Sequence, residues 1–298
     1  MAQMAQATTA TSSHQAVILA AGRGSRLASH TREMPKALLP IGPRSASDPT
    51  ETCFLRRQVE LLHAHGVHDI VVVVGCLKEQ ITTAAKHWDI PLRFVVNDTP
   101  DMGTSGSLHS FQFAVRAGLG VLNGERQTLL LDADIVYHRH ALAQFLSSHA
   151  GTSLLVSTSH RGDDEEVLTY GSVDHPRFLG KGLTTSLVAG EPCLGEAVGI
   201  VKFAPEDHAL AREVMDWMLG DPSAPEGTGK HKGFGPARRG TEHEELTQRF
   251  MRYRKMRAVL LPAELPFMEC DDAAEYKRLR ETFYPQLLEL EDRVGVGS

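Results

Sequence analysis

The chain has 298 residues, of which 31 are Lys or Arg and 37 are Asp or Glu, so its formal net charge is −6. Nucleic-acid binders owe most of their affinity to clustered basic residues, and this balance does not fit that class. Hydrophobic residues at 42% and charged residues at 23% are typical of a folded domain with a sizeable core. No apolar run approaches the roughly 18 residues of a membrane-spanning helix, so we expect no membrane partner.

The start of the chain carries neither the basic nor the apolar region of a secretion signal. We expect residues 1–14 to form a disordered tail. The cysteines lie far apart and lack metal-binding spacing, which favours reduced thiols in a cytoplasmic protein. They are Cys53, Cys76, Cys193 and Cys270.

Short apolar runs alternate with amphipathic segments of helix length in the first half of the chain. The expected strands are 16–20, 69–75, 92–97, 128–134 and 153–159, and the expected helices are 52–65, 78–88, 104–117 and 139–149. This alternation predicts an α/β fold with a Rossmann-like, doubly wound, mainly parallel sheet. Ligands of such sheets bind beyond the carboxyl ends of the strands.

After residue 160 the pattern breaks into shorter pieces. The expected strands are 171–173, 186–188, 195–203 and 257–261, and the expected helices are 206–219, 241–253 and a closing helix from 272. Residues 220–240 are rich in Gly, Pro and basic side chains. We interpret them as a mobile loop, which is either a lid over phosphates or a solvated connection.

The strongest motif is LAAGRGSRL at 19–27, followed by MPKALLPIG at 34–42. Gly22 and Gly24 allow a tight turn whose consecutive N–H groups face an anion. Arg26 adds a forked cation suited to phosphate oxygens, and Lys36 adds a point charge. A dinucleotide-binding turn would need glycine where Leu27 stands. The pattern therefore predicts a triphosphate cradle made of Leu19, Ala20, Ala21, Gly22, Arg23, Gly24, Ser25, Arg26 and Lys36.

These residues resemble the signature LAAGxGxR followed by PK of the nucleotidyltransferases that join a nucleoside monophosphate to a sugar phosphate or alcohol phosphate. The match covers Leu19, Ala20, Ala21, Gly22, Gly24, Arg26, Pro35 and Lys36. The resemblance implies the nucleotide-diphospho-sugar transferase type of fold. It also likens DMGTSGSL at 101–108 to the family's base-binding loop, which implies nucleotide contacts by Gly103, Thr104, Ser105 and Ser107. Thr104 or Ser105 could instead cap the following helix.

Two carboxylates, Asp132 and Asp134, end an expected strand and point to the same side. Hard oxygen ligands in this position suit Mg²⁺. The resemblance assigns the metal to Asp134, with Asp132 as a secondary ligand. Segment 266–276 is similar to the EIDxxxDL segment of the cytidylyltransferase branch that acts on phosphocholine and 2-aminoethylphosphonate, which places Asp271 as a further metal ligand. Alternatively, Asp271 or Asp272 caps the closing helix.

The stretch GEAVGIVKF at 195–203 is similar to the same branch, so the resemblance implies a Mg²⁺-dependent cytidylyltransferase. Its substrates would be CTP and a small phosphonate or phosphate monoester, either 2-aminoethylphosphonate or phosphocholine. Residues 15–160 would form the nucleotide-binding half of one domain and residues 161–298 the acceptor-binding half. The acceptor candidates are Lys181, Glu196 and Glu269. An acidic side chain would suit a primary ammonium, which ranks aminoethylphosphonate slightly ahead.

The acceptor phosphate is already anionic, so catalysis needs no base and depends on positioning and electrostatic stabilisation. Lys36 would stabilise the α-phosphate and Arg26 the β- and γ-phosphates. Two alternatives stay open at this point: a hexose-1-phosphate nucleotidylyltransferase and a nucleotide-sensing subunit without turnover. The sequence also leaves the oligomeric state open, with a homodimer as one option.

Overall fold

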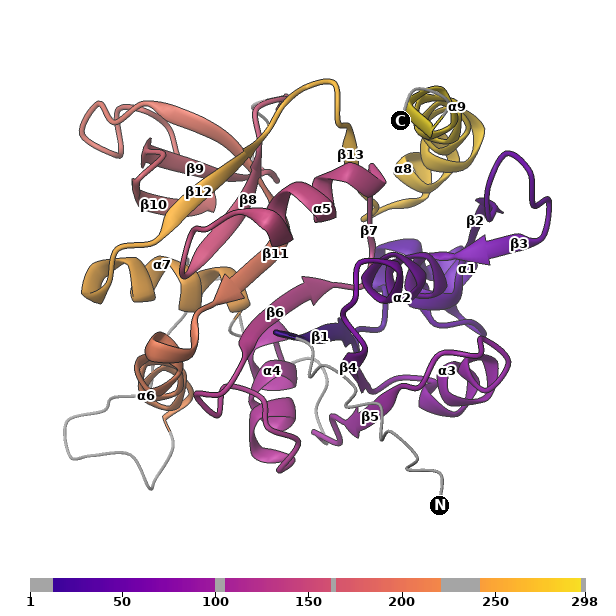
Figure 1. Cartoon of the computed structure of the whole chain (residues 1–298), viewed down its shortest axis with the longest axis horizontal. Helices are drawn as coiled ribbons and strands as arrows, with labels where there is room; N and C mark the ends of the chain where they lie inside the picture. The colour runs from indigo at the N-terminus through magenta and orange to yellow at the C-terminus, as the bar shows by residue number, and fades with distance from the viewer. Residues whose placement is uncertain (1–12, 100–104, 162–164, 221–241, 296–298) are drawn as a thin grey trace, which may run out of the picture.

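The computed structural model describes residues 13–99, 105–161, 165–220 and 242–295, and a single sheet dominates this part of the chain (Figure 1). The sheet has nine strands, with the order β10-β9-β11-β6-β1-β4-β5 and with β8 and β12 joined through β11. Its strands are β1 (His14–Ala20), β4 (Asp69–Val74), β5 (Arg93–Val96), β6 (Gln127–Asp132), β8 (Ser153–Ser157), β9 (Val167–Ser172), β10 (His175–Lys181), β11 (Cys193–Phe203) and β12 (Arg257–Leu261).

The first half of the sheet is parallel. Strand β1 lies between β4 and β6, with Ile18 opposite Val72 on one side and Leu131 on the other. These strands are apolar at nearly every position because helices cover both of their faces. The second half is mixed, since β11 runs antiparallel to β6, β8 and β9 while β12 runs parallel to β8. The predicted mainly parallel, mixed α/β sheet is confirmed.

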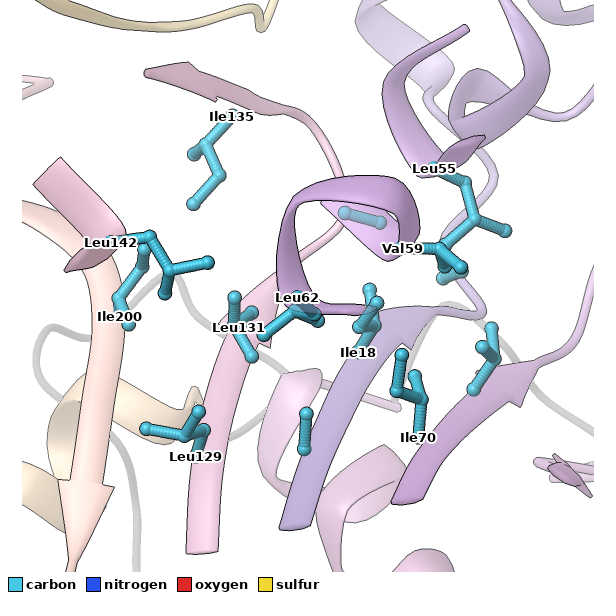
Figure 2. Packing of buried hydrophobic residues seen from close by; sticks show 14 of the residues in the cluster. Ile18, Leu55, Val59, Leu62, Ile70, Leu129, Leu131, Ile135, Leu142 and Ile200 are labelled. Carbon is cyan, nitrogen blue, oxygen red and sulfur yellow. The ribbon is translucent and has the colours of Figure 1, made fainter. Parts of the chain in front are cut away.

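Helices pack on both faces of the sheet. On one face α2 (Phe54–Ala64), α3 (Lys78–Ala85) and α5 (Arg139–Ser147) bury their apolar sides. Figure 2 shows Leu55, Val59 and Leu62 of α2 above Ile18 and Leu131. The opposite face is covered by α4 (Ser107–Arg116), α6 (His208–Leu219) and α7 (His243–Tyr253). The result is a three-layer arrangement in which loops at the strand ends are free to form a site.

Two small antiparallel pairs complete the structure: β2 (Pro40–Pro43) with β3 (Glu51–Cys53), and β7 (Ile135–Tyr137) with β13 (Phe267–Glu269). The chain then closes with α8 (Ala273–Arg278), a π-helical turn at Leu279–Phe283 and α9 (Tyr284–Gly295). These segments share a third apolar cluster with residues of β2 and α2. The C-terminal part of the chain therefore returns to the region formed by its first third (Figure 1).

Most expected elements are present with ends shifted by a few residues, and one is wrong. Residues 186–188 form no strand; they lie in a turn in which the Leu187 N–H donates to the Thr184 carbonyl at 2.9 Å, and Leu187 is 70% exposed. Strand β10 was not expected because its sequence, HPRFLGK, contains Pro and Gly. His14 already belongs to β1, so the expected tail is one residue too long; residues 1–12 and 221–241 lie outside the described part.

The described residues contain no helix that is both long and apolar enough to span a bilayer.

Candidate functional site

The turn after β1 is shaped by Gly24. Its φ is +61°, a left-handed conformation that glycine adopts without strain. A Cβ atom here would lie 3.1 Å from the Cβ of Lys36, so a larger residue would press on the lysine. The Gly24 carbonyl accepts hydrogen bonds from the Leu27 N–H at 2.9 Å and the Thr31 hydroxyl at 2.8 Å. Glycine is therefore required both by the turn and by its close approach to Lys36.

Short helical turns follow at Ser25–Leu27, Ala28–Thr31 and Lys36–Leu38.

Lys36 is the centre of the charged site. Its ammonium lies 2.5 Å from Oδ2 of Asp134 and 3.2 Å from Oδ1 of Asp271. Its side chain is only 12% exposed. Burial alone would lower the pKa of Lys36, but the carboxylates of Asp134 and Asp271 outweigh it and raise that pKa above its ordinary value. One cation thus joins two acids that are far apart in the sequence.

Strand pairing explains how the two acids meet. Strand β13 pairs with β7, which places Glu269 opposite Ile135, and the Cys270 N–H donates to the Asp134 carbonyl at 3.2 Å. The next residue, Asp271, therefore lies beside Asp134. The cap of α8 is Asp272, whose Oδ1 accepts from the Glu275 N–H at 2.8 Å. The capping role falls to Asp272, and the Asp271 carboxylate points to Lys36 instead.

Glu269 joins Asp134 and Asp271 in one group, in which one carboxylate oxygen from each lies within 4.8 Å of the others. Burial and the carboxylates of Asp134 and Asp271 raise the pKa of Glu269 well above its ordinary value. Burial would also raise the pKa of Asp271, but Lys36 and Arg26 lower it below the usual range. Three hard oxygen donors at this spacing fit a divalent cation such as Mg²⁺.

Arg26 and Lys181 extend the charged site through a shared acid. Arg26 pairs with Oδ2 of Asp271 at 2.9 Å and with Glu165 at 3.5 Å. Lys181 lies 3.3 Å from the same oxygen of Glu165. Arg26 is about half exposed, so its guanidinium is accessible to a ligand.

A second cluster surrounds Asp132. His243 Nε2 lies 3.4 Å from Oδ2 of Asp132, and His243 Nδ1 lies 3.3 Å from Oε2 of Glu244. Burial, and then the carboxylates of Glu244 and Asp134, raise the pKa of Asp132 well above its ordinary value. Asp132, His243 and Glu244 thus form a second group whose ligand atoms lie within 4.8 Å of one another, separate from the group of Asp134, Glu269 and Asp271.

The start of α4 is tied to the start of α7. The Ser107 hydroxyl donates to Glu242 at 2.7 Å and accepts from the His243 N–H at 2.7 Å. The Ser105 hydroxyl accepts from the amide of Asn97 at 3.1 Å. The predicted contacts by Gly103 and Thr104 lie outside the described residues. The hydroxyls of Ser105 and Ser107 are thus both hydrogen-bonded to neighbouring side chains or backbone.

The glycine turn, the two carboxylate clusters and the start of α4 line one cavity of about 540 Å³. The predicted site residues on its wall are Leu19, Ala20, Ala21, Gly22, Gly24, Ser25, Arg26, Lys36, Ser105, Ser107, Asp132, Asp134, Lys181, Glu269 and Asp271. Arg23 is exposed and is not on this wall. A neighbouring cavity of about 340 Å³ shares Arg26, Glu165, Glu269 and Asp271 with the larger one and adds Glu196.

Residues 16–197 match the family model of the MobA-like NTP transferase domain. The chain belongs to this family. The predicted membership in the nucleotidyltransferase family is confirmed.

The chain is 30% identical over 183 residues to the CMP-5'-(3-aminopropyl)phosphonate synthase of Streptomyces rubellomurinus, covering 55% of this chain and 27% of that protein. It is 27% identical over 167 residues to the mannose-1-phosphate guanyltransferase of Candida albicans, covering 54% of this chain and 41% of that protein. The chain thus spans less than half the length of either relative.

A solved structure with a similar fold is the inositol-1-phosphate CTP transferase of T. maritima, with a TM-score of 0.63 and 14% identity over 93% of this chain and 96% of that one. The predicted nucleotide-diphospho-sugar transferase type of fold is confirmed.

Sequence reasoning missed four acidic or imidazole side chains of this transferase: Glu165, Glu242, His243 and Glu244. Glu269 was predicted only as an acceptor-binding residue. In the structure it lines both cavities and belongs to the group of three carboxylates with Asp134 and Asp271. For Glu242, His243 and Glu244 the sequence signal was the acidic EHEE run at 242–245, which is equally typical of a helix start.

Proposed function

We propose that this protein is a Mg²⁺-dependent cytidylyltransferase that joins CMP from CTP to a small amino-phosphonate or amino-alcohol phosphate and releases pyrophosphate. The observation that carries this proposal is the meeting of Lys36, Asp134 and Asp271 on the wall of one cavity that also contains the glycine turn. Asp134 and Asp271 lie 98 and 235 residues after Lys36 in the chain.

Each side chain has a task in this reaction. The acceptor phosphonate or phosphate is an anion, so its oxygen attacks the α-phosphorus without loss of a proton. Lys36 binds the α-phosphate as charge develops there, while Arg26 and the N–H groups of the glycine turn hold the leaving pyrophosphate. Asp134, Asp271 and Glu269 would hold Mg²⁺, which supplies charge neutralisation between the two anions when it is bound.

The neighbouring cavity is proposed as the acceptor site. It is lined by seven acidic side chains and three arginines, an excess of negative charge that suits the ammonium end of an acceptor. Glu166 and Glu196 line this cavity and do not line the larger one. Its aromatic lining among the described residues consists of Phe267, Phe283 and the imidazole of His160, with neither Trp nor Tyr. This composition favours a primary ammonium over a quaternary one, which Trp and Tyr bind best.

We propose that the domain divides into residues 15–160, which supply Asp134 to this site, and residues 161–298, which supply Asp271. We retain that division as a proposal, along with a cytoplasmic location and reduced thiols. A hexose-1-phosphate nucleotidylyltransferase is the second candidate, since a mannose-1-phosphate guanyltransferase is among the relatives. The acid-rich acceptor cavity argues against it, because a hexose carries no cation.

The test is pyrophosphate release with each of the four ribonucleoside triphosphates, Mg²⁺ and a panel of acceptors. The panel holds 2-aminoethylphosphonate, 3-aminopropylphosphonate, phosphocholine and hexose 1-phosphates. Release with CTP and an aminoalkylphosphonate is the expected result. Release only with a hexose 1-phosphate would support the second candidate, and release with none would favour a nucleotide-sensing protein.

A further inference from the structure

We propose that Glu244 and Asp132, held in place by His243, bind the ribose hydroxyls of the nucleotide and so select ribonucleotides over deoxyribonucleotides. This inference rests on the proposed function, because it requires a nucleoside triphosphate in the larger cavity.

The position of this cluster in the cavity is the first reason. Asp132 ends β6, and Asp134 follows in the adjoining turn. Asp134 faces Lys36 at the phosphate end. On the other side, His243 Nδ1 lies 3.2 Å from the Ser107 hydroxyl at the start of α4, beside the proposed base end. In a nucleotide the group between the α-phosphate and the base is the ribose.

The chemistry of the cluster is the second reason. Within the described residues, Oε2 of Glu244 accepts no hydrogen bond; its near neighbour is His243 Nδ1 at 3.3 Å. The Asp132 carboxylate has a similar long contact with His243 Nε2, at 3.4 Å. Both side chains lie on the wall of the larger cavity and are about a quarter exposed, so a ligand there can reach their carboxylates. A ribose presents two hydroxyl donors on one edge, and binding them would satisfy both carboxylates.

The cluster is also built to stay in place. The His243 side chain is 2% exposed, and the His243 N–H is bound by Ser107 at 2.7 Å. Across the sheet, Gly199 of β11 faces Asp132, and a Cβ there would come within 2.6 Å of Oδ2 of Asp132. The glycine in the GEAVGIVKF stretch thus leaves room for the carboxylate. His243 acts as a positioning residue, since it touches both acids.

The experiment measures the dissociation constants of CTP, 2'-deoxy-CTP and 3'-deoxy-CTP in the presence of Mg²⁺ for the wild type, Glu244→Ala and Glu244→Gln. We expect the wild type to bind CTP at least about tenfold more tightly than one of the deoxy analogues. Glu244→Ala should weaken CTP binding by about tenfold and leave that analogue nearly unchanged, so the preference disappears. Glu244→Gln keeps a carbonyl acceptor and should retain part of the preference. The control is Glu213→Ala on the exposed side of α6, which should change none of the constants.

Equal weakening of CTP and both analogues by Glu244→Ala would overturn this inference, and loss of a bound Mn²⁺ in the same variant would identify the cluster as a cation site instead. If the wild type releases pyrophosphate from CTP but binds CTP and both analogues equally, the ribose assignment alone fails. If the wild type binds no nucleoside triphosphate, the proposed function fails and this inference fails with it.

Discussion

Two carboxylate clusters stand side by side in the larger cavity, and their electrostatic surroundings differ. The cluster of Asp134, Glu269 and Asp271 contains the ammonium of Lys36 and touches Arg26. The cluster of Asp132 and Glu244 has only the imidazole of His243 between its acids. The pKa of Asp271 is consequently lowered, while that of Asp132 is raised.

This difference separates two tasks that the sequence presents as one. Asp132 and Asp134 are two residues apart and suggest a joint metal site, yet their side chains contact different partners. Acids with a cation between them are ready to exchange that cation for a metal ion. Acids without one serve better as hydrogen-bond acceptors for a neutral ligand.

The largest expected effect is on catalysis by the first cluster. Lys36→Ala should lower the rate of pyrophosphate release by about 10²–10³, because a preorganised cation at the reacting phosphate is lost. Nucleotide binding should change much less, since the glycine turn and Arg26 remain. The measurement is single-turnover pyrophosphate release together with CTP binding. A rate within tenfold of the wild type would remove Lys36 from the mechanism.

The next largest effect concerns the competition between the Lys36 ammonium and a metal ion for the same carboxylates. Lys36→Met should strengthen Mn²⁺ binding in the absence of nucleotide by about tenfold, because the competing ammonium between Asp134 and Asp271 is removed. Electron paramagnetic resonance titration measures the free Mn²⁺ directly. Lys277→Met is the matched control, since Lys277 is exposed on α8. Unchanged or weaker Mn²⁺ binding in Lys36→Met would show that the lysine does not occupy the metal position.

Removing an acid from each cluster should change the free energy of unfolding in opposite directions. At neutral pH, Asp271→Asn should lower the free energy of unfolding by about 1–2 kcal/mol, because Lys36 and Arg26 each lose an ionic partner. Asp132→Asn should raise it by about 1 kcal/mol, because a buried charge among other acids is removed. Urea denaturation of both variants provides the values. Effects of the same sign would contradict the difference between the clusters.

The smallest effect is the pH dependence of the stability changes caused by Asp271→Asn and Asp132→Asn. The pKa of Asp271 is lower in the folded state than the 3.8 expected when unfolded, so its stabilising contribution is complete above pH 4 and is lost as the pH falls below that value. The pKa of Asp132 is raised, so its ionisation destabilises the fold only as the pH rises above 4. The benefit of Asp132→Asn should therefore grow from pH 4 to pH 8. A benefit that stayed constant over this range would show that charge is not its cause.

Local patterns predicted the parts of the fold and site that are continuous in sequence. The apolar runs of β1, β4 and β6 identified the central strands, and the glycine turn with Lys36 identified the phosphate end of the cavity. Strand β10 was missed because it is held by pairing with β9 rather than by its own composition.

The remaining site residues depend on packing between distant segments. Glu269 reaches Asp134 only because β13 pairs with β7, and His243 reaches Asp132 only because α7 packs beside the start of α4. Neither contact has a local sequence signal. Asp132 and Asp134 are neighbours in sequence, but they belong to two different groups of possible metal ligands.

The central claim is that Asp134 and Asp271 act as one unit at the reacting phosphate. A double-mutant cycle with Asp134→Asn, Asp271→Asn and the combined variant tests it most directly through single-turnover pyrophosphate release from CTP. If both acids serve the same step, either single change should lower the rate by about 10²–10³, and the combined variant should be little slower than the single ones. Losses that multiply in the combined variant would mean that the two acids act independently, and the single-site account would be wrong.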